Sequence, residues 1–176
     1  MLSTELQNEI LKLKKENSIY APFADSKYFK IICEKLAKPF ENSKIDKVLG
    51  LEARGFILGG AVAYLLNAGF AVLRKGGKMY PDNYGSESVY SIETTDYSGK
   101  VKTLEIQKSE MGIKSGDRVL IVDDWFETGG QGTAAIKLVE EAGGIVAGIG
   151  IMLDDMNENI RERFLKYNLN ALVKVK

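Results

Sequence analysis

The chain has 176 residues, of which 45% are hydrophobic and 27% charged, values typical of one globular domain with a sizeable core. Its 24 basic and 24 acidic residues balance to a net charge of +0, so neither nucleic acid nor an anionic membrane is indicated as a partner. Histidine is absent, which excludes histidine bases and histidine metal ligands. The single Cys33 excludes an internal disulfide and fits a reducing compartment. Residues 1–18 are amphipathic and charged, unlike a signal peptide, so we expect a cytoplasmic protein.

The hydrophobic pattern predicts helices first and then strands alternating with helices. Apolar residues at helical spacing predict a helix at 2–16, and a second helix is expected at 27–38, ending before Pro39. Further along, strands are predicted at 47–51, 70–75, 119–124, 145–153 and 171–175, with helices at 55–69, 131–144 and 157–168. This alternation predicts a single α/β domain, a mainly parallel twisted sheet with helices on both faces.

One segment interrupts the alternation. Residues 76–99 are rich in Gly, Ser, Tyr and Asp, and the stretches SVYSIE and KVKTLEIQ near them alternate as strands do. We therefore expect a flexible β-hairpin over residues 76–106, because loops of this length in a compact domain are usually lids or binding loops.

The stretch VLIVDDWFETGGQG carries the clearest chemistry. A helix beginning near Gly130 offers unpaired N–H groups and the positive end of its dipole, and the glycines let the backbone approach an anion closely. Asp123 and Asp124 precede this phosphate cradle, where they would suit sugar hydroxyls or a Mg²⁺ ion better than a phosphate. The ligand predicted is a sugar phosphate.

These residues carry a family resemblance. VLIVDDWFETGG resembles the phosphoribosyl pyrophosphate (PRPP) motif of type I phosphoribosyltransferases. LEARGFILGG, RKGGK and TLEIQK resemble the pyrophosphate loop, the basic stretch and the strand after the flexible loop of the adenine branch. The resemblance implies the fold of that family, residues 1–176 as one domain, with residues 1–40 forming a helix and a small hood over the site.

The resemblance also implies the PRPP ligands. The loop around the ribose and its 5′-phosphate comprises Asp123, Asp124, Glu127, Thr128, Gly129, Gly130, Gln131, Gly132 and Thr133. Glu52, Ala53, Arg54, Arg74, Lys75 and Lys78 are expected around the pyrophosphate, whose charges require cations and amides. Arg74 is also expected to reach across a dimer interface. Glu127 and Gln131 depart from the usual loop, because a small residue and a threonine are typical at these positions.

The reaction implied is purine salvage by a glycosyltransferase: a purine base displaces pyrophosphate from PRPP to give a nucleoside 5′-monophosphate, AMP if the base is adenine. Its oxocarbenium-like transition state requires that water be excluded and the leaving group's charge neutralised, which suits an enzyme without histidine. The expected catalytic residues are Arg54 and a hairpin carboxylate, either Asp96 or Glu93. Mg²⁺ is the expected cofactor, with Asp123 and Asp124 as its partners through water or ribose.

Base recognition is expected from Phe23 and Ala24 of the hood and from Trp125. Phe23 and the indole of Trp125 would form a slot for a flat purine. Ala24 replaces an arginine usual in the adenine branch, and the Gly-Gln pair resembles xanthine phosphoribosyltransferases. Adenine is therefore the leading base, with a xanthine or guanine enzyme as the alternative. The same motifs would also fit a regulator that binds PRPP without turnover, and the cradle alone would fit an unrelated phosphate-binding α/β domain.

Overall fold

The structure is a computed structural model, and it describes residues 2–16, 18, 20–79, 89–95, 99–108 and 112–175. Its helices are α1 (Thr4–Lys15), α2 (Ala21–Ala24), α3 (Ser26–Ala37), η1 (Lys38–Phe40), α4 (Arg54–Leu65), α5 (Gly130–Glu141) and α6 (Glu158–Leu165). Its strands are β1 (Lys47–Leu51), β2 (Gly69–Lys75), β3 (Val89–Thr95), β4 (Val101–Gln107), β5 (Arg118–Phe126), β6 (Ile145–Asp154) and β7 (Leu169–Lys174).

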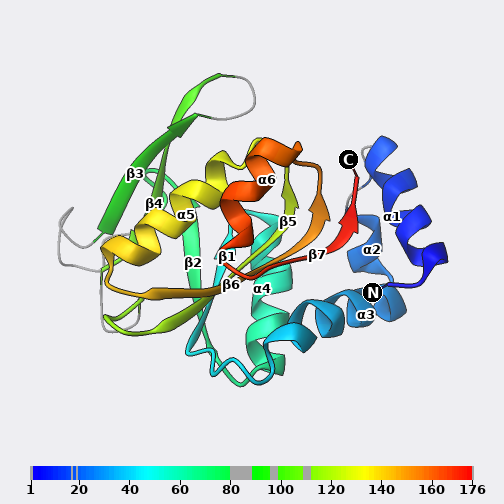
Figure 1. Cartoon of the computed structure of the whole chain (residues 1–176), viewed down its shortest axis with the longest axis horizontal. Helices are drawn as coiled ribbons and strands as arrows, with labels where there is room; N and C mark the ends of the chain where they lie inside the picture. Colours follow the sequence, from blue (N-terminus) through cyan, green and yellow to red (C-terminus); the bar gives the residue numbers. More distant parts are fainter. Residues whose placement is uncertain are drawn as a thin grey trace.

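The described strands form one seven-stranded sheet in the order β3-β4-β2-β1-β5-β6-β7. Strands β2, β1, β5, β6 and β7 run parallel, and the β3–β4 hairpin is added antiparallel at the β2 edge (Figure 1). This confirms the mainly parallel sheet predicted from the alternation of strands and helices. The carboxyl ends of the parallel strands lie along one edge, where α/β sheets bind their ligands.

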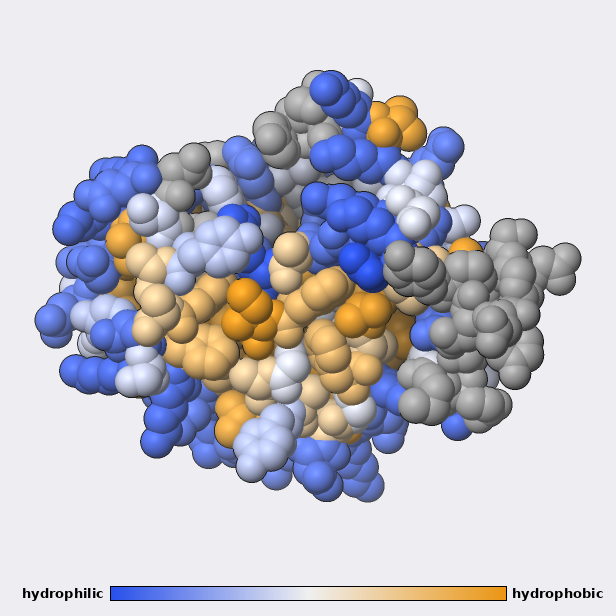
Figure 2. Space-filling model, turned by 180° about the vertical axis from the view of Figure 1, so that it is seen from behind, coloured by the Kyte–Doolittle hydropathy of each residue, from blue (hydrophilic) through white to orange (hydrophobic). Residues whose placement is uncertain are grey.

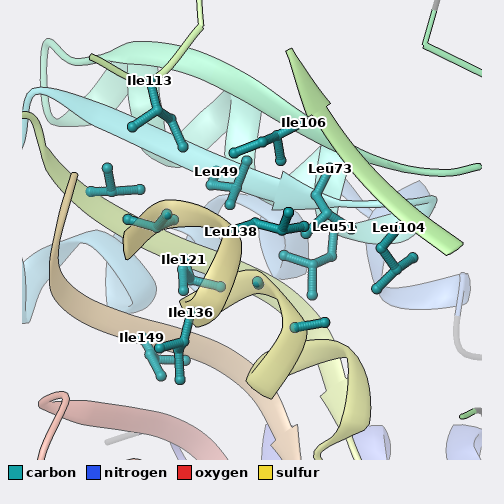
Figure 3. Close-up of a cluster of buried hydrophobic side chains, with 14 of the residues drawn as sticks. Leu49, Leu51, Leu73, Leu104, Ile106, Ile113, Ile121, Ile136, Leu138 and Ile149 are labelled. Carbon is teal, nitrogen blue, oxygen red and sulfur yellow. The ribbon is translucent and has the colours of Figure 1, made fainter. Parts of the chain in front are cut away.

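Two hydrophobic clusters hold the helices against opposite faces of the sheet. One cluster joins β1, β5 and β6 to α5 and α6, and it includes Leu49, Ile121 and Leu138 (Figure 3). The other joins α1, α3 and α4 to the opposite face, where Val48, Leu120 and Val122 point. The side chains of successive residues in one strand thus point to opposite faces of the sheet, as strand geometry requires. The doubly covered sheet therefore has helices on both faces, as predicted.

The N-terminal segment folds over one end of this sheet. Helix α1 buries Leu6 and Ile10 and lies beside the end of β7 (Figure 1). The sequence predicts a loop over residues 17–26, but within it Ala21–Ala24 forms the short helix α2. Asp25 then caps α3, since its carboxylate accepts the Tyr28 N–H at 2.9 Å. No helix among the described residues is long and apolar enough to cross a bilayer.

Candidate active site

The two adjacent acids lie inside a strand rather than at its end. The sequence places Asp123 and Asp124 at a strand end, but β5 continues to Phe126 because Trp125 and Phe126 still pair with β6. Both aspartates are buried, with 5% and 4% of their surface exposed. Burial, and then repulsion by Asp124, raises the pKa of Asp123 well above its usual range. Two adjacent carboxyl groups buried in this way favour hydrogen-bond donors and nearby cations.

Arg54, the first residue of α4, is the cation beside these acids. Its Nε lies 2.7 Å from Asp124 Oδ2, and the Asp124 side chain is 6% exposed against 28% for Arg54. Burial raises the pKa of Asp124, and the Arg54 guanidinium opposes that rise. Gly55 makes the approach possible, because a Cβ there would lie 2.9 Å from Asp123 Oδ1. The helix start and the acid pair thus pack directly against each other.

The Glu52 carboxylate contacts three residues of the basic stretch RKGGK. Lys78 Nζ donates to it at 2.6 Å, the Lys75 backbone N–H donates at 3.0 Å, and Arg74 Nε lies at 3.5 Å. Burial opposes ionisation, but the hydrogen bonds from Lys78 and Lys75 lower the pKa of Glu52 overall. The Glu52–Ala53 peptide bond is cis. Glu52 therefore holds Arg74 and Lys78 at the carboxyl ends of β1 and β2.

The predicted phosphate cradle connects β5 to α5. Gly129 has φ +70°, a left-handed conformation that favours glycine, and α5 begins at the next residue. The Gly130 N–H points to Thr128 Oγ1 at 3.4 Å, and Thr133 N–H closes the first helical turn on the Gly129 carbonyl at 2.9 Å. A Cβ on Gly132 would clash with the Phe126 ring, so the glycine lets α5 pack tightly on β5.

A cavity of about 250 Å³ opens above this loop. The loop forms its floor, while Lys75 from β2, Thr95 from β3 and Lys102 from β4 form the rest of its lining. The residues of the loop that border the cavity are Phe126, Glu127, Thr128, Gly129, Gly130, Gln131 and Gly132. The cavity thus combines the N-terminus of a helix with two lysines, a setting that favours an anion.

The hairpin carries one of the two carboxylates proposed from sequence. Glu93 is exposed on β3, whereas Asp96 lies outside the described residues. In the sheet register, Glu93 lies opposite Thr103 of β4. Glu105, two residues after Thr103 on β4, lies opposite Arg74 of β2. Because directly paired residues point to the same side of a sheet, Glu93 lies on the face that also carries Arg74.

The residues expected to bind the base pack against the same hydrophobic cluster. Phe23 and Trp125 both border the cluster beneath α1 and α3, and Phe23 makes edge-to-face contacts with Tyr20 and Phe29 at 6.3 and 6.1 Å. The Trp125 indole N–H is buried and has no hydrogen-bond partner among the described residues. Such a donor is usually satisfied by water or a ligand.

Sequence reasoning missed a lysine at this end of the site. Lys14 Nζ of α1 lies 4.9 Å above the Trp125 ring and 2.5 Å from Asp155 Oδ2. Lys14 belongs to the polar side of an amphipathic helix, where periodicity predicts only a solvated charge. The sequence held one indication of such a pair. Asp155 lies just after the apolar stretch 145–153, and a carboxylate buried there needs a cation.

Comparison with known proteins gives a consistent match. The family described as "Phosphoribosyl transferase domain" matches residues 22–176. The adenine phosphoribosyltransferase of Brachyspira hyodysenteriae is 39% identical over 145 residues, which are 82% of this chain and 80% of that protein. The enzyme of the same name from Roseobacter denitrificans is 38% identical over 152 residues, covering 85% of this chain and 81% of that protein.

Solved structures agree. The adenine phosphoribosyltransferase of Thermoanaerobacter pseudethanolicus is 36% identical with a TM-score of 0.77, covering 89% of this chain and 86% of that one. The Giardia lamblia enzyme, solved with 9-deazaadenine, is 29% identical with a TM-score of 0.77, covering 90% of this chain and 85% of that one.

Proposed function

The chain belongs to the phosphoribosyl transferase family, and on that premise we propose that it is an adenine phosphoribosyltransferase of purine salvage. A ring nitrogen of adenine attacks the anomeric carbon of PRPP, the bond to pyrophosphate breaks, and the base loses a proton, which gives AMP. The observation that carries this proposal is the acid pair with its arginine directly before a helix-N-terminal anion cradle. The names of the relatives above favour adenine over xanthine or guanine.

PRPP is proposed to lie across the carboxyl edge of β5. Its ribose hydroxyls would donate to Asp123 and Asp124, whose burial leaves them in need of donors. Its 5′-phosphate would occupy the cavity above Thr128, Gly129 and Gly130. The diphosphate would then point toward the Ala53–Arg54 turn and the cations that Glu52 gathers, Arg74 and Lys78. Fixed positive charge here would stabilise the departing pyrophosphate.

Mg²⁺ is proposed as an ion that accompanies the substrate. Among the described residues no group of three or more acidic or cysteine side chains is arranged to hold a metal. Asp124 is paired with Arg54, and Asp123 Oδ1 accepts the Asp124 N–H at 2.9 Å, so the acids do not form a cage. They fit an ion that keeps its waters and binds mainly substrate phosphates. Bound in this way, Mg²⁺ would neutralise part of the diphosphate charge.

The hairpin is proposed to exclude water and to supply the carboxylate near the base. Glu93 is favoured for this role because its side of the sheet is the side of Arg74. Closure of the hairpin would bring that face over the ribose. The carboxylate would then accept, directly or through water, the proton that the attacking base gives up.

Adenine is proposed to bind between Phe23 and Trp125. The buried indole N–H of Trp125 lacks a partner in the described part of the chain and would donate toward the base or its water. Ala24 offers only backbone groups, which can read the edge of adenine. Lys14 covers the Trp125 ring in this structure, so the base would stack on the other indole face or replace the ammonium.

A homodimer is proposed on the outer face of α4. Ile57, Tyr64, Leu65 and Phe70 are exposed, at 41%, 86%, 45% and 38%, and Figure 2 shows apolar residues gathered in the middle of this side of the molecule. Exposed apolar patches of this kind mark interaction sites. We expect Tyr64→Lys to shift the sedimentation coefficient from dimer to monomer, and an unchanged dimer would refute this interface.

A single assay separates enzyme from regulator and identifies the base. The protein is incubated with PRPP, Mg²⁺ and adenine, guanine, hypoxanthine or xanthine in separate samples, and monophosphates are resolved by chromatography. We expect AMP from adenine and much less product from the other bases. PRPP binding by calorimetry without turnover of any base would support the regulator instead. Asp124→Asn serves as the control, because near-normal turnover in that variant would contradict the assigned site.

A further inference from the structure

The β3–β4 hairpin presents different side chains to the two faces of the sheet. Lys75 of β2 pairs with Leu104 of β4, and Lys102 lies two residues from Leu104 on the same strand. Lys102 in turn pairs with Thr94 of β3. Strand geometry therefore places Lys75, Lys102 and Thr94 on one face, opposite to the face of Glu93 and Arg74.

That face ends at the phosphate loop. A Cβ on Gly130 would lie 3.0 Å from the Thr95 carbonyl oxygen and 3.3 Å from Thr94 Oγ1, so the end of β3 packs on the start of α5. Lys102 is half-buried, and with Lys75 it lines the cavity above the loop. The hairpin thus brings a lysine of its own to the place proposed for the 5′-phosphate.

The same cavity contains a negative charge from this chain. Glu127 borders it together with Lys75 and Lys102. A carboxylate beside a phosphate dianion weakens phosphate binding unless a cation offsets it. Lys75 alone would balance Glu127 and leave no excess positive side-chain charge for the phosphate. A phosphate there would require a further cation, and Lys102 is a second lysine that lines the cavity.

We propose that Lys102 is a 5′-phosphate ligand of this enzyme and that it compensates for Glu127 in the phosphate loop. This inference rests on the proposed function, because it takes the cavity above Gly129 and Gly130 as the 5′-phosphate subsite. One consequence follows for the hairpin. Since Lys102 is on β4, occupation of the subsite would stabilise the hairpin against α5.

The test measures AMP and pyrophosphate binding by calorimetry, because AMP carries the 5′-phosphate and pyrophosphate occupies the other subsite. Lys102→Met is expected to weaken AMP binding about tenfold, the loss typical of one charge-assisted hydrogen bond, and to leave pyrophosphate binding unchanged. Lys102→Arg keeps the charge and should retain most of the affinity. Lys100→Met is the matched control, since Lys100 is on the same hairpin but is not among the residues that line the cavity.

A second experiment replaces Glu127 by Gln and measures AMP binding in the same way. Alone it should tighten AMP binding, and combined with Lys102→Met it should return affinity toward that of the wild type. Equal AMP affinities for Lys102→Met and Lys100→Met, in a wild type that converts adenine to AMP, would overturn the Lys102 proposal and leave the proposed function standing. Parallel losses of AMP and pyrophosphate binding would also overturn it, because they indicate a general effect on the hairpin. A wild type that neither forms nor binds AMP would refute both proposals.

Discussion

Removing Arg54 from its ion pair with Asp124 should cost much more stability than removing Asp124. The Asp124 side chain is 6% exposed, whereas that of Arg54 is 28% exposed. Arg54→Met leaves a buried carboxylate without its cation, and we expect it to lower the free energy of unfolding at pH 8 by about 3 kcal/mol. Asp124→Asn leaves a guanidinium that water can reach, and we expect a loss of about 1 kcal/mol.

The pH dependence follows from the direction of the Asp124 pKa. Burial already raises this pKa, and loss of the opposing Arg54 charge raises it further. A carboxyl with a raised folded-state pKa keeps its proton in the folded protein when the unfolded chain has lost it. Stability therefore falls as pH rises from about 4 through the folded-state pKa. The Arg54→Met variant should thus lose more stability between pH 5 and pH 8 than the wild type does.

The assay is urea unfolding, monitored by fluorescence at pH 5 and pH 8 for the wild type, both single variants and the double variant. Adding Asp124→Asn to Arg54→Met removes the buried carboxylate that has lost its cation, so the double variant should be more stable at pH 8 than Arg54→Met alone. Asp123 does not cancel from this comparison, because Asp124 raises its pKa and Arg54 lowers it. Arg54→Met therefore raises the pKa of both aspartates, and the larger loss of stability between pH 5 and pH 8 belongs to the pair. Equal and additive losses in the two single variants, with no change between pH 5 and pH 8, would refute this reasoning.

Two further predictions concern packing around the site. Gly132→Ala would place a Cβ against the Phe126 ring, so the start of α5 must move. We expect the variant to lose about 1–3 kcal/mol of stability in urea unfolding and to have a higher KM for PRPP. An unchanged KM would show that the phosphate loop tolerates the shift. Lys14→Met removes the cation from buried Asp155 and from the Trp125 ring. We expect a loss of about 1–3 kcal/mol in stability and an altered KM for adenine with an unchanged KM for PRPP; a change confined to PRPP would argue against a base site at Trp125.

Local pattern was sufficient to predict most elements. Hydrophobic periodicity predicted the parallel strands and the helices that follow them, because each strand must be buried on both faces and each helix on one. The phosphate cradle was also readable from the sequence, since VLIVDD followed by Thr-Gly-Gly specifies strand, turn and helix within a few residues. The comparisons confirm the family resemblance drawn from these motifs.

Contacts between distant segments could not be read from the sequence. The pattern did not show that β5 continues beyond Asp124 to Phe126, because pairing with β6 decides where that strand ends. It did not show that Glu52 gathers Arg74 and Lys78, nor that Lys14 reaches Asp155, since these partners are far apart in the chain. Periodicity describes only which face of an element is buried. The partner of a buried charge is fixed by how the elements pack, and only the tertiary structure determines that.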